Sequence, residues 1–169
     1  MNSVLAQWNQ ADEATALAAM LACCAARRWA EAMVALRPSN SVGEVRRAAD
    51  QVWSTMEEPD WIEAFAAHPR IGERKARSMQ TTAADWSQQE QSSTALAPPQ
   101  VLTELAQGNA LYEQIFGFSY IVCATGKSAE EMLAILRRRL SNDRQQELRE
   151  AAEQQREIMQ IRLGKWLAE

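Results

Sequence analysis

The single histidine of the chain, His68, is the residue whose type best suits proton transfer. An imidazole titrates near neutral pH, so it can both accept and donate a proton. The residue before a proline avoids the α-helical conformation, and Pro69 therefore predicts that His68 stands at a helix exit. A lone histidine is also a common surface residue. No second histidine or reactive cysteine stands with it in the pattern of a nucleophilic triad.

A second polar group of residues begins at Ser87, and its Ser-x-x-Glu spacing to Glu90 is typical of a capping box. This spacing predicts that a helix begins at Ser87. The N–H groups and positive potential of a helix N-terminus suit a polar or anionic substrate. The neighbouring amides of Gln88, Gln89 and Gln91 can donate and accept hydrogen bonds, although alone they are typical of a solvated surface.

Two sets of arginines differ in their surroundings. The run Arg137-Arg138-Arg139 spreads over more than half of a helix circumference, and its default interpretation is a solvated face. Arg162 lies among Ile158, Ile161 and Trp166, which indicates a partly buried helix face. A guanidinium there needs a carboxylate or a planar polar ligand, so either a structural ion pair or a substrate contact explains it.

The elements that must position these residues are helices, with one exception. Capping boxes, apolar spacing and Pro or Gly boundaries predict an all-α, single-domain helical bundle that spans residues 1–169. Residues 71–84 are expected to form a loop. The apolar, β-rich residues 118–124 are too isolated to build a sheet and predict one short extended segment. The predicted helices cover residues 14–26, 27–36, 41–56, 60–67, 87 onward, 98–116, 128–140 and 143–166.

Composition excludes several classes of protein. A net charge of −4 over 169 residues argues against nucleic acid or an anionic membrane surface as a partner, and no apolar run is long enough to span a membrane. The N-terminal residues lack the pattern of a secretory signal. The three cysteines show no disulfide or zinc-site spacing, which favours buried thiols and a reducing cytoplasm. We therefore expect no metal site.

Taken together, the motifs resemble those of the OHCU decarboxylase family, whose substrate is 2-oxo-4-hydroxy-4-carboxy-5-ureidoimidazoline. The similarity follows the chain in order and spacing, with Ser119 where the family commonly has Pro. The motifs are Asp60-Trp61-x-x-Ala64-Phe65, His68-Pro69-Arg70-Ile71-Gly72-Glu73, Ser87 with Glu90-Gln91, Phe116-Gly117-Phe118 leading to Ile121-Val122-Cys123-Ala124, and Arg162-Leu163.

The resemblance implies a helical fold, no cofactor, and conversion of the substrate to (S)-allantoin and carbon dioxide in urate degradation. Catalytic roles would fall on His68, Glu90 and Arg162. Implied substrate contacts fall on Pro69, Ser87, Gln88, Gln89 and Gln91, and on the backbone of Tyr120, Ile121, Val122, Cys123 and Ala124. An extended backbone suits this role because no helix consumes its N–H and C=O groups.

Two other functions remain open at the level of sequence. Six tryptophans and Ala-rich faces suit a non-enzymatic helical interaction module, which predicts an exposed apolar groove and no polar pocket around His68. A different lyase or hydrolase that acts on a related ureido compound is the second alternative. Exposed Trp and Met side chains are compatible with a homodimer.

Overall fold

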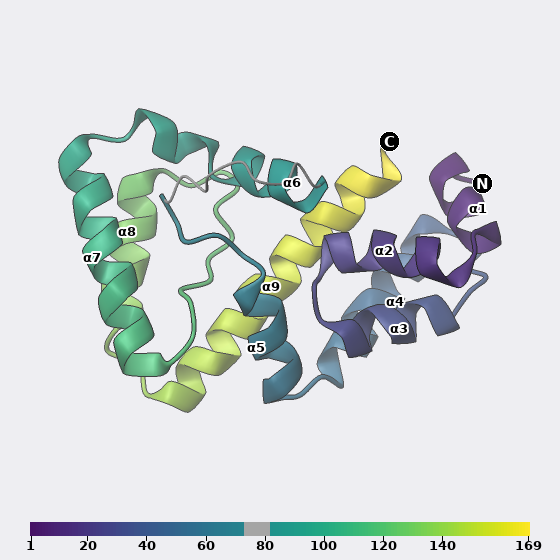
Figure 1. Cartoon of the computed structure of the whole chain (residues 1–169), viewed down its shortest axis with the longest axis horizontal. Coiled ribbons are helices and arrows are strands. Elements are labelled where there is room, and N and C mark those ends of the chain that lie inside the picture. The colour runs from purple at the N-terminus through teal and green to yellow at the C-terminus, as the bar shows by residue number, and fades with distance from the viewer. Residues whose placement is uncertain (73–81) are drawn as a thin grey trace. The chain divides into compact units, whose positions relative to one another are not determined.

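The structure, a computed structural model, describes residues 1–72 and 82–169, and within these residues every regular element is a helix. The predicted all-α class is therefore confirmed (Figure 1). Of the loop predicted at residues 71–84, positions 73–81 lie outside the described residues, as does Glu73 of the His68 motif. The helices are α1 Ser3–Gln10, α2 Glu13–Cys23, α3 Arg27–Ala35, α4 Val42–Ser54, α5 Glu58–Ala66, α6 Thr82–Glu90, the 3₁₀ helix η1 Ser92–Leu96, α7 Pro99–Phe116, α8 Ala129–Arg139 and α9 Arg144–Leu167.

The chain forms two compact units. Unit 1 comprises residues 1–64 and 155–169, and unit 2 comprises residues 65–154. Helices α5 and α9 contribute residues to both units. The single-domain organisation expected from the sequence stays a prediction.

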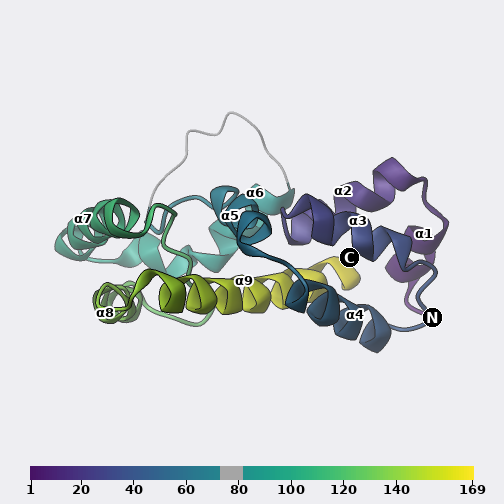
Figure 2. The same ribbon diagram turned by 90° about the horizontal axis from the view of Figure 1, so that it is seen from below.

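Unit 1 packs α2, α3 and α4 around buried apolar side chains, and α2 and α3 lie side by side in Figure 2. The predicted capping box at the start of α4 is confirmed, because the Ser41 hydroxyl accepts the Glu44 N–H at 3.1 Å. Trp29 of α3 donates its indole N–H to the Ala49 carbonyl of α4 at 3.1 Å. This bond satisfies the polar atom of a fully buried ring and fixes α3 against α4.

Two features of unit 1 differ from the sequence expectation. The helix predicted over residues 14–26 ends earlier, at Cys23, because the chain leaves the α conformation at Cys24, with φ −152° and ψ 119°. Burial of Cys24 and Ala26 in the connection to α3 stabilises the break. Helix α1 was not predicted, although Leu5 and Trp8 are three residues apart on its buried face. The helix is only eight residues long, too short for a clear apolar period.

Unit 2 contains the predicted long helix α7, which begins at Pro99 and ends at Gly117 as expected. Gly117 has φ 81°, the left-handed conformation that closes many helices. Helices α7 and α8 pack side by side (Figure 1). At Gly108 an added Cβ would lie 2.5 Å from the Leu136 Cδ2, so the missing side chain permits the close approach of these helices.

The arginine run at the end of α8 does not form one solvated face, and this interpretation was wrong for Arg139. Arg137 and Arg138 are exposed, whereas Arg139 is fully buried. The Arg139 Nε donates to the equally buried Glu147 at 2.7 Å, and its Nη1 donates to the Ile121 carbonyl at 2.6 Å. The buried ion pair offsets the desolvation of both charges.

Aromatic and amide groups complete this arrangement. The Tyr112 hydroxyl and the Asn142 amide donate to the Glu147 carboxylate at 2.5 and 3.0 Å. The Arg139 guanidinium lies 4.9 Å from the ring centre of Tyr120. Burial disfavours a charged Arg139, but the hydrogen bond and attraction from Glu147 prevail and raise the pKa of Arg139. We call Tyr112, Tyr120, Arg139, Asn142 and Glu147 the Arg139 cluster.

Replacement of Gly117 by alanine should lower the free energy of unfolding by about 1–2 kcal/mol, because an L-residue is strained at positive φ. Nothing lies within 4 Å of the added Cβ, so the change in stability reports backbone strain without a steric clash. The control Gly43→Ala lies in the first turn of α4 without a positive φ and should be neutral or stabilising. Urea unfolding measures both variants, and equal effects would contradict the interpretation.

Glu147→Gln should lower the free energy of unfolding by about 3–5 kcal/mol, because it leaves the Arg139 charge buried without its counter-ion. The matched control is Glu150→Gln, on the same helix. Its ion pair with Arg138 is largely exposed and should contribute at most about 1 kcal/mol. Chemical denaturation at neutral pH compares them, and similar losses for both variants would refute a special role for the buried pair.

Candidate active site

His68 lies just after α5, where the sequence predicted a helix exit. The helix ends at Ala66, and the His68 N–H donates to the Phe65 carbonyl at 3.2 Å. His68 and Pro69 are both half-buried, so they remain reachable from solvent. The predicted position of the imidazole at the helix exit is therefore confirmed.

Helix α7 holds the residues that follow the histidine. The Asn109 amide donates to the Ile71 carbonyl at 3.1 Å in a buried hydrogen bond. The Arg70 guanidinium binds Glu113 through two hydrogen bonds, of 2.6 and 3.0 Å. Bidentate pairs of this kind fix both position and orientation. The chain after His68 is thus fastened at two successive residues by side chains that the sequence analysis did not single out.

Helix α6 corrects the expectation for Ser87. The helix begins at Thr82 and ends at Glu90, so Ser87 lies in its second half and caps no helix start. The Ser87 hydroxyl donates to the Ala83 carbonyl, four residues earlier, at 2.9 Å. The predicted helix N-terminus at Ser87, and with it the anion-binding potential of that N-terminus, is therefore wrong.

The side chains of α6 divide between two faces. Trp86, Ser87 and Glu90 are buried, whereas Gln88 and Gln89 are exposed. Just after the helix, the Gln91 side chain accepts the Gly72 N–H at 3.1 Å and so joins this region to the segment that follows His68. The structure therefore brings Gln91 to the His68 region and leaves Gln88 and Gln89 facing solvent.

Residues 118–124 form the predicted extended segment and have no neighbouring strand among the described residues. The five residues from Tyr120 to Ala124 are all buried. Side chains supply the hydrogen bonds that a strand would otherwise supply. Arg139 binds the Ile121 carbonyl, the Gln154 side-chain oxygen accepts the Cys123 N–H at 2.8 Å, and Lys127 Nζ donates to the Cys123 carbonyl at 2.7 Å.

Tyr120 and Val122 are the exceptions within this segment. Both are buried, yet neither residue has a hydrogen-bond partner for its N–H or its C=O among the described residues. Buried backbone groups nearly always have a partner, and an exception calls for a ligand, a water or a strained fold as its explanation. Val122, which lies between the hydrogen-bonded residues Ile121 and Cys123, therefore presents one donor and one acceptor for a ligand.

An aromatic cluster connects the His68 region with the extended segment. The ring of Phe65, three residues before His68, lies 5.5 Å from that of Phe118 at the start of the segment. Tyr112 of α7 packs edge-on against Phe118 at 5.7 Å. In unit 2 the helix exit at His68 and the extended segment thus share one aromatic core.

Arg162, the remaining predicted catalytic residue, belongs to unit 1. It is buried, as its apolar neighbours indicated, and its Nη1 donates to the Ala22 carbonyl at the end of α2 at 3.5 Å. The positive charge of Arg162 also reaches Cys23 and Cys24. Both thiols, like that of Cys123, are buried and belong to no disulfide, which confirms the packing role expected for the cysteines.

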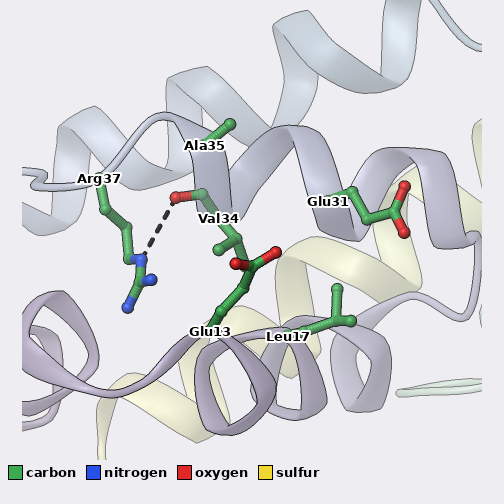
Figure 3. Close-up of a pocket in the computed structure, with 6 residues that line it drawn as sticks. All are labelled: Glu13, Leu17, Glu31, Val34, Ala35 and Arg37. Atoms are coloured by element: carbon green, nitrogen blue, oxygen red, sulfur yellow. Dashed lines mark hydrogen bonds between the residues drawn. The ribbon is translucent and has the colours of Figure 1, made fainter.

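A cavity of about 290 Å³ opens in unit 1, where Leu17 and Val34 contribute apolar surface and Glu13 and Glu31 contribute carboxylates (Figure 3). Arg37 lines it, but its guanidinium is held by the Val34, Trp8 and Ala11 carbonyls. None of the residues singled out from the sequence lines this cavity.

Residues 1–72 and 82–169 contain neither a candidate metal site nor a candidate membrane span. No cluster of three or more His, Cys, Asp or Glu side chains there has an arrangement that would hold a metal ion. None of the helices in those ranges is long and apolar enough to cross a membrane.

These features define an all-helical protein in which a histidine at a helix exit and a buried extended segment share one core. The chain belongs to the OHCU decarboxylase family, whose model matches residues 9–164. A crystal structure of OHCU decarboxylase in the presence of (S)-allantoin superposes with a TM-score of 0.77 at 32% identity, covering 90% of this chain and 99% of that one.

Curated relatives agree with this membership. The uric acid degradation bifunctional protein TTL of Arabidopsis thaliana is 37% identical over 144 residues, covering 85% of this chain and 44% of that protein. The 2-oxo-4-hydroxy-4-carboxy-5-ureidoimidazoline decarboxylase of Amia calva is 32% identical over 96 residues, covering 57% of this chain and 55% of that protein. The chain thus spans about half the length of these two relatives.

Burial of the Cys23 and Cys24 thiols should make the stability of the folded protein depend on pH under alkaline conditions. Burial raises the pKa of Cys23 and of Cys24 from 9.0 to about 12. Unfolding lets both thiols ionise at their ordinary pKa, so their contribution to stability is fully present below about pH 9 and is lost as the pH rises toward 12.

Each thiol should lower the free energy of unfolding by at most about 1.4 kcal/mol per pH unit within that window. Urea unfolding at several pH values measures the slope. The control is the double variant Cys23→Ala/Cys24→Ala, whose slope should be shallower. Equal slopes for the two proteins would show that these thiols do not contribute.

Proposed function

We propose that this protein catalyses the cofactor-independent decarboxylation of 2-oxo-4-hydroxy-4-carboxy-5-ureidoimidazoline to (S)-allantoin and carbon dioxide in urate degradation. The observation that carries the proposal is the likeness to a solved OHCU decarboxylase over 99% of that chain at 32% identity. The Arabidopsis and Amia relatives, whose names refer to uric acid degradation and to this decarboxylase, support it.

The chemistry of the substrate explains why side chains and backbone suffice. The carboxylate leaves from a carbon next to a ring C=N bond. As the C–C bond to the carboxylate breaks, its electron pair moves into the imine; the 4-hydroxyl group then loses its proton to become a carbonyl, and the former imine carbon, which bears the ureido group, gains a proton. Because the imine accepts the electron pair, the reaction needs no external electron sink. The protein must orient the carboxylate, stabilise charge on the ring, and protonate one face.

We assign the proton transfers to His68. In this proposal its imidazole accepts the proton of the 4-hydroxyl group, whose carbon becomes a carbonyl, or delivers a proton to the neighbouring ring carbon that bears the ureido group. Its half-buried position after α5 supports the assignment, because the imidazole is reachable by a small molecule while its backbone is held by Phe65. Pro69 and Gln91 would border the substrate on the same side.

Binding of the polar edges of the substrate would fall to three groups. The Glu90 carboxylate, buried at the end of α6, would accept hydrogen bonds from ureido or ring N–H groups. Ser87 lies on the same buried face of that helix. The guanidinium of Arg162 would bind a carbonyl oxygen or the departing carboxylate.

The backbone of the extended segment would bind the ureido group of the substrate through hydrogen bonds. A urea offers an N–H and a C=O side by side, and Val122 offers the complementary donor and acceptor. Recognition through Val122 agrees with the state of its two neighbours, because backbone groups of Ile121 and Cys123 are already held by side chains of the protein.

We further propose that the protein works in the cytoplasm and as a homodimer. Three buried thiols that belong to no disulfide suit a reducing compartment. Leu111 and Ile115, four residues apart on α7, are 46% and 50% exposed and offer apolar surface for a second copy. Sedimentation of the purified protein tests the dimer, and a monomer at micromolar concentration would exclude it.

The proposed activity is tested by making the unstable substrate in situ from urate with urate oxidase and the following hydrolase, and then adding this protein. Circular dichroism should show (S)-allantoin forming faster than in the blank. Optical activity that grows at the blank rate would reject the proposal. A panel of other ureido compounds would then test for a related lyase or hydrolase.

His68→Asn should lower kcat by about 10²–10⁴-fold, the usual contribution of a positioned acid or base, without changing the thermal midpoint. Gln146→Asn is the control, since Gln146 is exposed on α9 in unit 2. It should retain the rate of the unaltered protein. A His68→Asn rate close to that of the control would remove His68 from the mechanism.

A further inference from the structure

The extended segment depends on side chains for its backbone hydrogen bonds, and these bonds fall on alternate residues. Arg139 Nη1 binds the Ile121 C=O at 2.6 Å. Gln154 Oε1 accepts the Cys123 N–H at 2.8 Å, and Lys127 Nζ donates to the Cys123 C=O at 2.7 Å. Three polar groups on two residues, separated by Val122, are therefore occupied by neighbouring side chains.

This spacing determines where the groups of Val122 point. In an extended chain successive residues direct their N–H and C=O groups to opposite sides. The groups of Ile121 and Cys123 face Arg139 and Gln154, so those of Val122 face the other way. There they meet no hydrogen-bond partner within residues 1–72 and 82–169.

We propose that Arg139 and Gln154 are positioning residues of the reaction: they fix the rotation of the extended segment and thereby aim the Val122 N–H and C=O at the ureido group of the substrate. The proposal rests on the proposed function. It adds two side chains that act through the backbone and do not touch the substrate themselves. A rotation of the segment about its own axis would turn the donor and acceptor of Val122 away from the ligand.

The two positioning residues differ in how cleanly they can be tested. Arg139 is fully buried and paired with Glu147, so its replacement perturbs the Arg139 cluster as a whole. Gln154 is half-buried on α9, and its side-chain oxygen holds one backbone N–H of the segment. Gln154 therefore separates positioning from general stability.

The decisive variant is Gln154→Met, which keeps the length of the side chain and removes the acceptor. It should raise KM by about tenfold, the equivalent of one good hydrogen bond, while kcat stays within about twofold. Gln154→Glu keeps an oxygen at the same place and should return KM to within about threefold of the unaltered protein. Gln146→Met makes the same chemical change at an exposed position of α9 and should change neither constant.

Each outcome decides a separate question. If the unaltered protein makes (S)-allantoin no faster than the blank, the proposed function fails and this inference fails with it. If the unaltered protein is active and Gln154→Met has the KM of Gln146→Met, the inference is overturned while the function stands. A thermal midpoint for Gln154→Met well below that of Gln146→Met also overturns it, because Gln154 would then be a structural residue.

Discussion

The buried ion pair between Arg139 and Glu147 is the interaction on which the candidate site depends most. A buried chain segment with no neighbouring strand among the described residues needs side chains to pair most of its backbone groups. Arginine supplies several donors from one side chain, and Arg139 uses them on Ile121 and Glu147 at once. Glu147 in turn supplies the negative charge that offsets the desolvation of the buried Arg139 guanidinium. The extended path of residues 118–124 therefore follows from a charge placed in the core.

Local patterns predicted most of the helices because capping and helix termination are short-range effects. Ser41 and Ser128 each accept the N–H three residues later, as their Ser-x-x-Glu spacing indicated, and Gly117 ends α7 at positive φ. The same spacing at Ser87 misled, because Thr82 already begins that helix. Sequence alone does not distinguish a capping pattern inside a helix from one at its start when the preceding residues, here Ala and Asp, occur both within helices and just before them.

The residues that sequence reasoning missed act over long distances in the chain. Asn109 and Gln154 are ordinary polar residues of helices, and nothing near them in sequence reveals the carbonyl or N–H that each binds. Arg139 was hidden for a related reason, since two exposed arginines precede it and its burial depends on α9 and the extended segment. The family motifs predict which residues form the site, whereas packing decides which of their atoms are left for a ligand.

A site that presents main-chain atoms responds to evolution differently from one made of side chains. At Val122 the donor and acceptor are common to every amino acid except proline, which lacks the N–H. Substitutions that keep the volume of this buried residue therefore leave the polar pattern intact. Sequence drift along the segment is limited by packing rather than by ligand chemistry, and recognition can persist in relatives whose side chains there have diverged.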